Sequence, residues 1–229
     1  MRKVTLFAAF LCFTSLAWSE TTQEATDARL VHAGAVLHEI MAAPDKGIPE
    51  EVLDHARCIA VVPHMVKGGF VFGAEGGRGV ATCRTPHGWS APAFFAITGG
   101  SWGLQIGVEG IDLVMILQGD SGLNRLISSK FEIGGDASAA AGPVGRHASA
   151  DTDWKLNTEI LTYSRARGVF AGISLNGSAI RRDDDSTKAI YGSDVPTRSI
   201  LHGEVPPPPA AQPFLDAVVN AQAVAKASK

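Results

Sequence analysis

The sequence lacks the short motifs that would indicate a metal site or a nucleotide site. It contains no H-E-x-x-H or C-x-x-C segment, and its seven histidines are scattered. A catalytic or structural zinc site is therefore not indicated. The glycine-rich segments lack the G-K-[ST] sequence of a phosphate-binding P-loop. We expect no metal, no cofactor and no enzymatic activity.

Excess basic charge is missing, and aromatic residues are scarce. The chain has 20 Lys and Arg against 23 Asp and Glu, and only 7% of its residues are aromatic. Nucleic-acid-binding domains usually carry a basic stripe, so we expect no nucleic-acid partner. With 229 residues, 45% of them hydrophobic, the chain is long enough for one substantial core. The 25 glycines indicate that backbones approach one another closely in that core.

The apolar run at the N-terminus is too short to span a bilayer. Two basic residues precede the apolar segment 4–16, and small residues stand at Ala17 and Ser19, as a signal peptidase requires. The sequence therefore predicts a signal peptide at 1–19. The mature protein would be exported, periplasmic or secreted, and could lie peripherally on a membrane. A retained membrane anchor is the alternative.

Two cysteines, Cys58 and Cys83, would remain after that cleavage. An exported protein meets an oxidising compartment, which favours a disulfide. Pairing requires Cα atoms within about 7 Å, which the sequence does not show. A Cys58–Cys83 disulfide and two buried free thiols both stay open.

The hydrophobic periodicity changes from helical to extended near Cys58. Apolar residues at helical spacing predict a helix over 27–41, and Pro49 opens a second, short helix. Alternating residues from Cys58 onward predict strands. Among these, 69–75 and 80–84 are predicted to form a hairpin around the glycines at 76–79.

These patterns predict an α+β fold, with N-terminal helices packed on a glycine-rich, mainly antiparallel β-sheet. We expect an N-terminal helical arm at 20–57 and a glycine-rich, β-rich core at 58–200. A Pro-rich spacer and a C-terminal helix would occupy 201–229.

Basic residues accompany the glycines in segments 67–80, 141–146 and 163–172. Backbone N–H groups in a glycine turn can bind an anion, and the arginine fork matches phosphate oxygens. The candidate headgroup contacts are Lys67, Arg78, Arg146, Arg165 and Arg167. The alternative is a set of ordinary hairpins whose arginine stems cover apolar surface.

Residues 99–103 match the nucleophile-elbow pattern G-x-S-x-G, with Ser101 as the nucleophile. That elbow requires a strand before the serine and a helix after it. The residues after Ser101 alternate as a strand, so the context does not fit. A serine hydrolase is therefore only a minor alternative.

Several ordered motifs together resemble the SYLF domain family, which occurs in eukaryotic membrane-trafficking and actin-associated proteins and in exported bacterial proteins. The matching segments are 67–80, 89–94, 100–107, 134–137, 141–146, 163–172 and 191–192. The resemblance implies a non-enzymatic domain that binds phospholipids, phosphoinositides in eukaryotes, and actin in some eukaryotic members. For bacterial members it also implies a subdomain resembling the BON lipid-binding fold.

For an exported chain, the resemblance makes anionic phospholipid at the cell envelope the expected ligand. Some family members use a basic amphipathic N-terminal helix for membrane contact, whereas this helix is acidic. The second hypothesis is a structural or protein-interaction module of the envelope. In that case the spacer Pro206–Pro209 would place the C-terminal helix on a protein partner.

Overall fold

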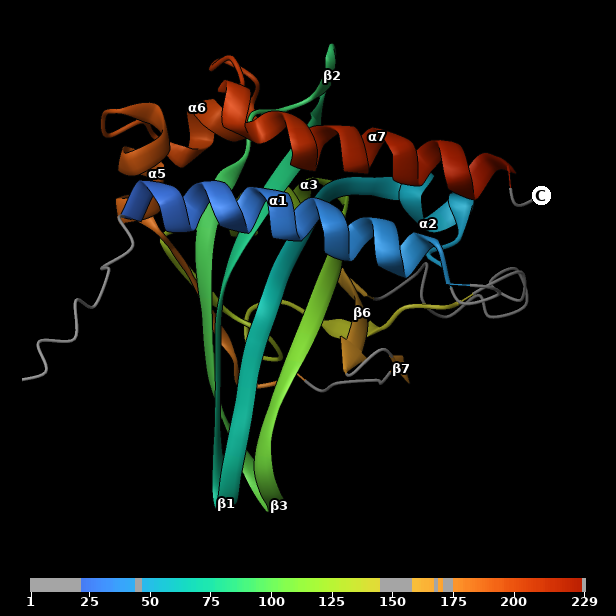
Figure 1. Cartoon of the computed structure of the whole chain (residues 1–229), viewed down its shortest axis with the longest axis vertical. Helices are drawn as coiled ribbons and strands as arrows, with labels where there is room; N and C mark the ends of the chain where they lie inside the picture. Colours follow the sequence, from blue (N-terminus) through green and yellow to red (C-terminus); the bar gives the residue numbers. More distant parts are fainter. Residues whose placement is uncertain (1–21, 44–46, 145–157, 167–168, 171–174, 228–229) are drawn as a thin grey trace, which may run out of the picture.

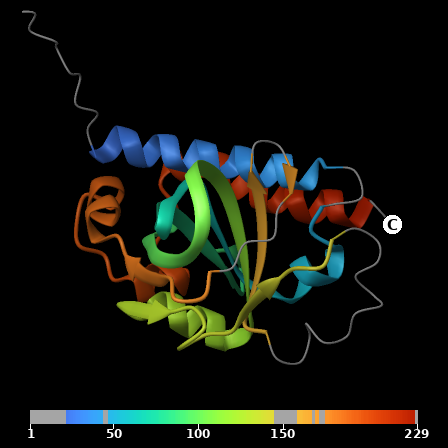
Figure 2. The ribbon, with the colours of Figure 1, turned by 90° about the horizontal axis from the view of Figure 1, so that it is seen from below.

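The computed structural model describes residues 22–43, 47–144, 158–166, 169–170 and 175–227. A curled, mainly antiparallel sheet lies between helices on two sides (Figures 1 and 2). This arrangement confirms the predicted α+β class. In chain order the elements are α1 (Thr22–Met41), α2 (Glu50–His55), β1 (Ala56–Thr85), β2 (Gly88–Trp89), β3 (Ala93–Gln118), α3 (Gly119–Ile127), β4 (Lys130–Glu132), β5 (Ala139–Ala141), β6 (Ile160–Ala166), β7 (Val169–Phe170), β8 (Ala179–Arg182), α5 (Asp184–Tyr191), α6 (Thr197–Leu201), a 3-10 turn (Pro209–Ala211) and α7 (Gln212–Ala227).

Two long strands form the centre of the fold. β1 pairs antiparallel with β3 from Ala56 opposite Gln118 to Ala81 opposite Ala93. The register shifts between Val62 and Met65 and again near residue 70. Such irregularities bend strands. The two strands therefore run down together, turn and run back up, as Figure 1 shows. We call this paired structure the β1–β3 ribbon.

The predicted hairpin around residues 76–79 is wrong. These residues continue β1, paired with 95–98 of β3, and the glycines among them do not have positive φ angles. Their role is close packing. A Cβ on Gly77 would lie 2.6 Å from Cγ1 of Val62, and one on Gly79 would lie 2.3 Å from the Phe95 ring. The glycines thus allow the returning half of the ribbon to pack against its own neighbours.

Short strands extend both halves of the ribbon. β6 pairs with residues 111–117 of β3, and β8 pairs with residues 95–98 of the same strand. β4 joins the far side of β8, and β5 runs parallel to β6. Gly177 has the positive φ expected of a turn. β7 pairs antiparallel with β6.

The alternation of side chains along the strands creates two apolar clusters. In one, Val61 and Ile116 face α1 and α7 and meet Phe214. In the other, Met115 lies inside the curled sheet and meets Leu123 of α3. Each face of the ribbon therefore has its own core, and the sheet separates them.

The C-terminal helix belongs to the first of these cores. α7 lies alongside α1 in both ribbon views, and Phe214 and Val218 are fully buried. α1 is likewise buried along one side. The buried face of α7 is thus unavailable to the partner that the spacer hypothesis placed there. Among the described residues, no helix is both long enough and apolar enough to cross a membrane.

Candidate functional site

One end of the β1–β3 ribbon projects beyond the rest of the molecule (Figure 1) and points toward the viewer in Figure 2. We define it as residues 68–74 of β1 and 99–108 of β3, and call it the ribbon end. Neither segment contains Asp, Glu, Lys, Arg or His. Val108 is 72% exposed, and Val66, just before the ribbon end, is 52% exposed. Its larger apolar and aromatic residues are Phe70, Val71, Phe72, Trp102, Leu104, Ile106 and Val108.

An ion pair lies where the ribbon end joins the body. The Lys67 Nζ atom is 3.4 Å from Oε2 of Glu75, and the Ser178 hydroxyl donates a hydrogen bond to Oε1 of the same carboxylate. Glu75 is 7% exposed. Since Lys67 and Glu75 flank the bend in β1, their contact joins the descending and returning parts of the strand. The predicted headgroup contact Lys67 therefore faces a carboxylate of its own chain.

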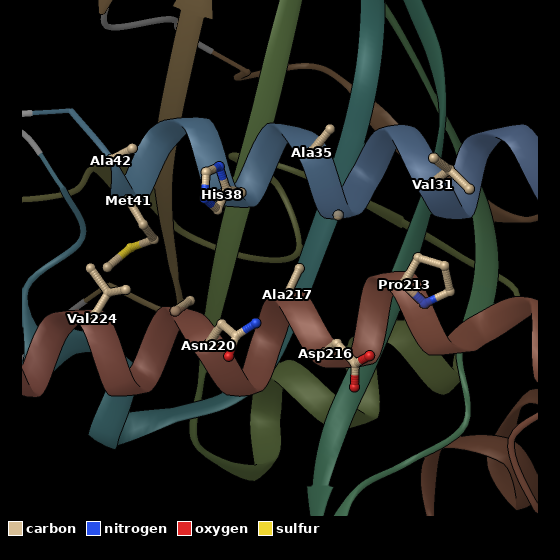
Figure 3. A pocket seen from close by; sticks show the side chains of 12 residues that line it. Val31, Ala35, His38, Met41, Ala42, Pro213, Asp216, Ala217, Asn220 and Val224 are labelled. Carbon is tan, nitrogen blue, oxygen red and sulfur yellow. The ribbon is translucent and has the colours of Figure 1, made fainter.

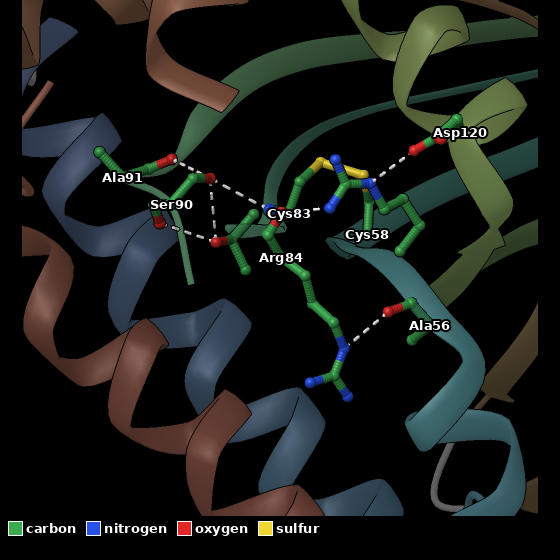
Figure 4. The surroundings of a disulfide bond; sticks show 9 residues. Ala56, Cys58, Cys83, Arg84, Ser90, Ala91 and Asp120 are labelled. Carbon is green, nitrogen blue, oxygen red and sulfur yellow. Dashed lines mark hydrogen bonds and ion pairs between the residues drawn. A yellow bond between two sulfur atoms is a disulfide. The ribbon is translucent and has the colours of Figure 1, made fainter. Parts of the chain in front are cut away.

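A disulfide joins the two parts of β1 at the opposite end of the ribbon (Figure 4). The Sγ atoms of Cys58 and Cys83 are 2.03 Å apart. Nearby, Nε of Arg84 donates to the carbonyl oxygen of Ala56 at 2.9 Å. The backbone N–H of Cys83 donates to Oγ of Ser90 at 3.0 Å. Covalent and hydrogen-bonded contacts thus hold the base of the ribbon closed.

A buried ion pair fixes α1 to the start of α5. Nη1 of Arg29 lies 3.1 Å from Oδ2 of Asp183, and both residues are less than a tenth exposed. Asp183 also accepts hydrogen bonds from the backbone N–H and the hydroxyl of Ser186. The segment 183–186 is therefore a capped helix start. Arg78 approaches the same carboxylate at 3.9 Å, with its side chain 59% exposed.

The protonation of this pair follows from its surroundings. Burial by itself raises the pKa of Asp183. The hydrogen bonds from Ser186 and the positive charges of Arg29 and Arg78 outweigh it, and the pKa lies below its ordinary value. Burial also lowers the pKa of Arg29, against the attraction of Asp183. Asp183 is thus an anion held among cations.

Arg165 also forms ion pairs with carboxylates of its own chain. Its Nη2 atom contacts Glu39 of α1 and lies 3.5 Å from Oδ2 of Asp112 on the neighbouring strand. Tyr163, two residues before Arg165 on β6, is only 2% exposed and belongs to the first core. Burial raises the pKa of Tyr163, and its hydroxyl donates to the carbonyl oxygen of Pro143. Tyr163 is therefore not available to a headgroup at this edge.

The predicted headgroup contacts do not converge in the described part of the chain. Lys67, Arg78 and Arg165 each approach a different carboxylate, on different parts of the sheet. Arg146 and Arg167 lie outside the described residues. Glu75 faces Lys67 across a bend in β1, and the partners of Arg78 and Arg165 are distant in the sequence, so spacing alone could not reveal these contacts.

The nucleophile-elbow geometry is not formed at Ser101. The serine lies within β3, opposite Gly73 of β1, and strand continues on both sides of it. The required helix after the serine is thus replaced by extended backbone. No group of three or more His, Cys, Asp or Glu side chains among the described residues could hold a metal ion.

A groove runs between α1 and α7 on the outer side of the helical layer (Figure 3). Its volume is about 310 Å³, and its walls are mostly apolar. Val31 at one end and Val224 at the other are partly exposed, at 52% and 42%. His38, Asp216 and Asn220 supply its few polar groups. The groove is a surface on which another apolar segment could pack.

Comparisons with known proteins point to one family. The model of the family described as "Ysc84: Las17-binding protein actin regulator" matches residues 98–221. This range includes the returning part of β3 in the ribbon, the strands β4 to β8 and most of α7. The match therefore covers most of β3 and the elements that follow it, but not α1, α2, β1 or β2.

Curated relatives agree with this match. SH3 domain-containing YSC84-like protein 1 of Rattus norvegicus is 37% identical over 171 residues, which are 74% of this chain and 50% of the relative. Protein YSC84 of Saccharomyces cerevisiae is 36% identical over 175 residues, 75% of this chain and 37% of the relative. LAS seventeen-binding protein 3 of the same species is 34% identical over 174 residues, 74% of this chain and 38% of the relative. The chain spans half or less of the length of these relatives. It belongs to the Ysc84 family, whose domain is the SYLF domain that the sequence motifs resemble.

Proposed function

We propose that this chain is a non-enzymatic module that binds membranes rich in anionic phospholipid through the ribbon end. The observation that carries the proposal is the ribbon end itself, which projects from the body and contains no ionisable side chain. A projecting, uncharged segment with an apolar residue as exposed as Val108 suits an interaction site. A bilayer suits it because the whole projecting end, and not one patch on its side, is uncharged.

The residue types at the ribbon end suit the membrane–water interface. Trp is enriched at the headgroup level of bilayers, and the transfer of Phe, Leu and Ile side chains out of water is favourable. The ribbon end carries all four residue types. Paired strands also satisfy much of their backbone hydrogen bonding internally, which lowers the cost of entering an apolar layer. Shallow insertion into the interface is therefore favourable for such a ribbon.

The base of the ribbon would support insertion by holding the end in place. The Lys67–Glu75 ion pair and the Cys58–Cys83 disulfide join the two parts of β1 on either side of the bend. An end that is already ordered loses less conformational entropy when it meets a membrane. We further propose that the protein acts after export, at the cell envelope, where anionic phospholipid is the available ligand.

Sedimentation with vesicles tests the proposal. The full chain should sediment with vesicles that contain phosphatidylglycerol and much less with pure phosphatidylcholine, and high salt should weaken binding. Val108→Asp should reduce binding, because it places a charge at the ribbon end. Val219→Asp is the matched control, since Val219 is 55% exposed on α7. Equal binding to both lipids, no binding, or equal loss in both variants contradicts the proposal.

A second candidate function is protein binding in the groove between α1 and α7. The apolar walls of this groove favour it, and the family description names Las17 binding and actin regulation. Ala35 lines the groove and is exposed, so Ala35→Arg should block it. Co-sedimentation with purified actin filaments should then fall while vesicle binding stays the same. If the unaltered chain does not sediment with filaments, or Ala35→Arg has no effect, actin binding through this groove is excluded.

A further inference from the structure

Three basic residues on neighbouring strands stand at the same level of the sheet. Arg78 of β1 is opposite Ala96 of β3, Ala96 is opposite Arg181 of β8, and Arg181 is opposite Lys130 of β4. Residues directly opposite each other in an antiparallel sheet point to the same face. We call Arg78, Arg181 and Lys130 the cation row. The sequence separates its members by up to about a hundred residues, so only the strand register brings them together.

The cation row lies on an open part of the sheet. All three of its side chains are exposed, and Ala96 between them is half-buried. The next level of the same face carries Gly76, Thr98 and Ala179, which are small, and Glu132 at its outer edge. Small side chains thus lie between Arg78 and Arg181 on this face, and an anion could approach the three cationic groups there.

The neighbouring acids do not neutralise this row. Arg78 is 3.9 Å from Asp183, but that carboxylate is held by Arg29 at 3.1 Å. Glu132 lies two residues from Lys130 on the same face, and no ion pair joins the two. Among the described residues, Arg181 and Lys130 have no carboxylate within ion-pair distance. The row thus keeps most of its positive charge.

Such a row costs stability. Like charges directly opposite each other on adjacent strands repel and destabilise a sheet. Arg181 and Lys130 form that pair, and Arg78 adds a third charge two strands away, at roughly 10 Å. An anion bound between them would replace the repulsion with attraction. Arginine is suited to the task because its fork binds phosphate oxygens in pairs.

We propose that the cation row is a binding site for a phosphate group. The proposal rests on the proposed function in so far as the phosphate belongs to a lipid headgroup; a free phosphate compound offers the same chemistry. The site contains one residue predicted from the sequence, Arg78, and two that were not, Arg181 and Lys130. It gives the membrane-binding module a polar contact in addition to its uncharged ribbon end.

Charge-removal variants of the full chain test the site. The double variant Arg181→Gln/Lys130→Gln should bind phosphatidylglycerol vesicles about 25-fold more weakly, since each basic residue near an anionic surface contributes about fivefold. The control Arg198→Gln/Lys226→Gln makes the same change in net charge at exposed positions on α6 and α7. Its binding should stay within about twofold. Equal weakening by both double variants overturns the site, because net charge alone would then explain the loss.

Thermal unfolding separates the site from the lipid. Inorganic phosphate should raise the midpoint of the unaltered chain and of the control, but not that of Arg181→Gln/Lys130→Gln. Without phosphate, the latter variant should melt at the same or a higher temperature than the unaltered chain, because the repulsion is gone. A lower midpoint, or a phosphate shift that persists in this variant, overturns the site. If no vesicle binds but the selective phosphate shift occurs, the proposed function fails and the phosphate site stands.

Discussion

The two ends of the β1–β3 ribbon differ in what their residues do for the fold. At the base, strand residues are buried on both faces, between the helices and the interior of the sheet, and a disulfide joins Cys58 to Cys83. At the ribbon end, Val108 is largely exposed, and Figure 1 shows this end of the ribbon away from the helices. The same two strands are thus part of the hydrophobic cores at the base and project from the body at the ribbon end.

This difference indicates that the base of the ribbon serves the stability of the fold and that the ribbon end serves binding. Apolar residues at the base are explained by the cores that they fill. Val108 at the ribbon end is 72% exposed and fills no core, although a charged or polar residue there would keep an exposed ribbon soluble. We infer that substitutions at the base change the free energy of unfolding, and that substitutions at the ribbon end change binding.

The largest expected effect comes from Asp183→Ala in the buried pair that fixes α1 to α5. The change leaves Arg29 buried without a counter-charge and should lower the free energy of unfolding by about 3–5 kcal/mol. Denaturant unfolding measures it. Asp184→Ala is the control, because its side chain is exposed, and it should cost less than about 1 kcal/mol. Similar losses in both variants would show that the pair is unimportant.

The same carboxylate predicts a dependence on acid. The pKa of Asp183 is lower in the folded chain than in the unfolded chain. Its stabilising contribution is therefore complete above the unfolded pKa and is lost as the pH falls through the folded pKa. Unfolding midpoints measured from neutral pH downward should fall less steeply in Asp183→Ala than in the unaltered chain. Parallel curves would contradict the pKa direction.

Opening the disulfide should have the next largest effect. Cys58 and Cys83 are 25 residues apart, and a bond that closes a loop of that size stabilises a chain by about 3 kcal/mol. The unfolding midpoint in denaturant should therefore fall when a reductant is added. Cys58→Ala/Cys83→Ala should be less stable than the oxidised chain and insensitive to reductant. A reductant effect that remains in the double variant would have another cause.

Glu75→Gln should have a smaller effect at the junction of the two regions. The amide keeps a hydrogen-bond acceptor for Ser178 but removes the charge that Lys67 faces, at a cost of about 1–3 kcal/mol. In the double variant Lys67→Met/Glu75→Gln, part of that loss should return, because no charge is left without a partner. Strictly additive losses would show that the two side chains do not interact.

The sequence predicted the helices better than the path of the strands. The sequence located α1, the short α2 after Pro49 and the C-terminal helix α7, because each of these signals is local. The glycines at 76–79 suggested a turn, yet their small size serves contacts with Val62 and Phe95, which no local pattern reveals. Arg165 was predicted to be free for a ligand, but its partner Glu39 is on α1, brought near only by folding. Arg181 and Lys130 likewise become neighbours only through the register of the paired strands, which the sequence does not show.

The most direct test of the central claim is the depth of the ribbon end in a membrane. A nitroxide label attached to Val108→Cys reports its environment by paramagnetic resonance, and a label on Val219→Cys provides the comparison. When phosphatidylglycerol vesicles are added, the label at position 108 should enter an apolar environment while the label at position 219 stays in water. If the chain binds the vesicles and the label at position 108 remains in water, the ribbon end is not the membrane contact.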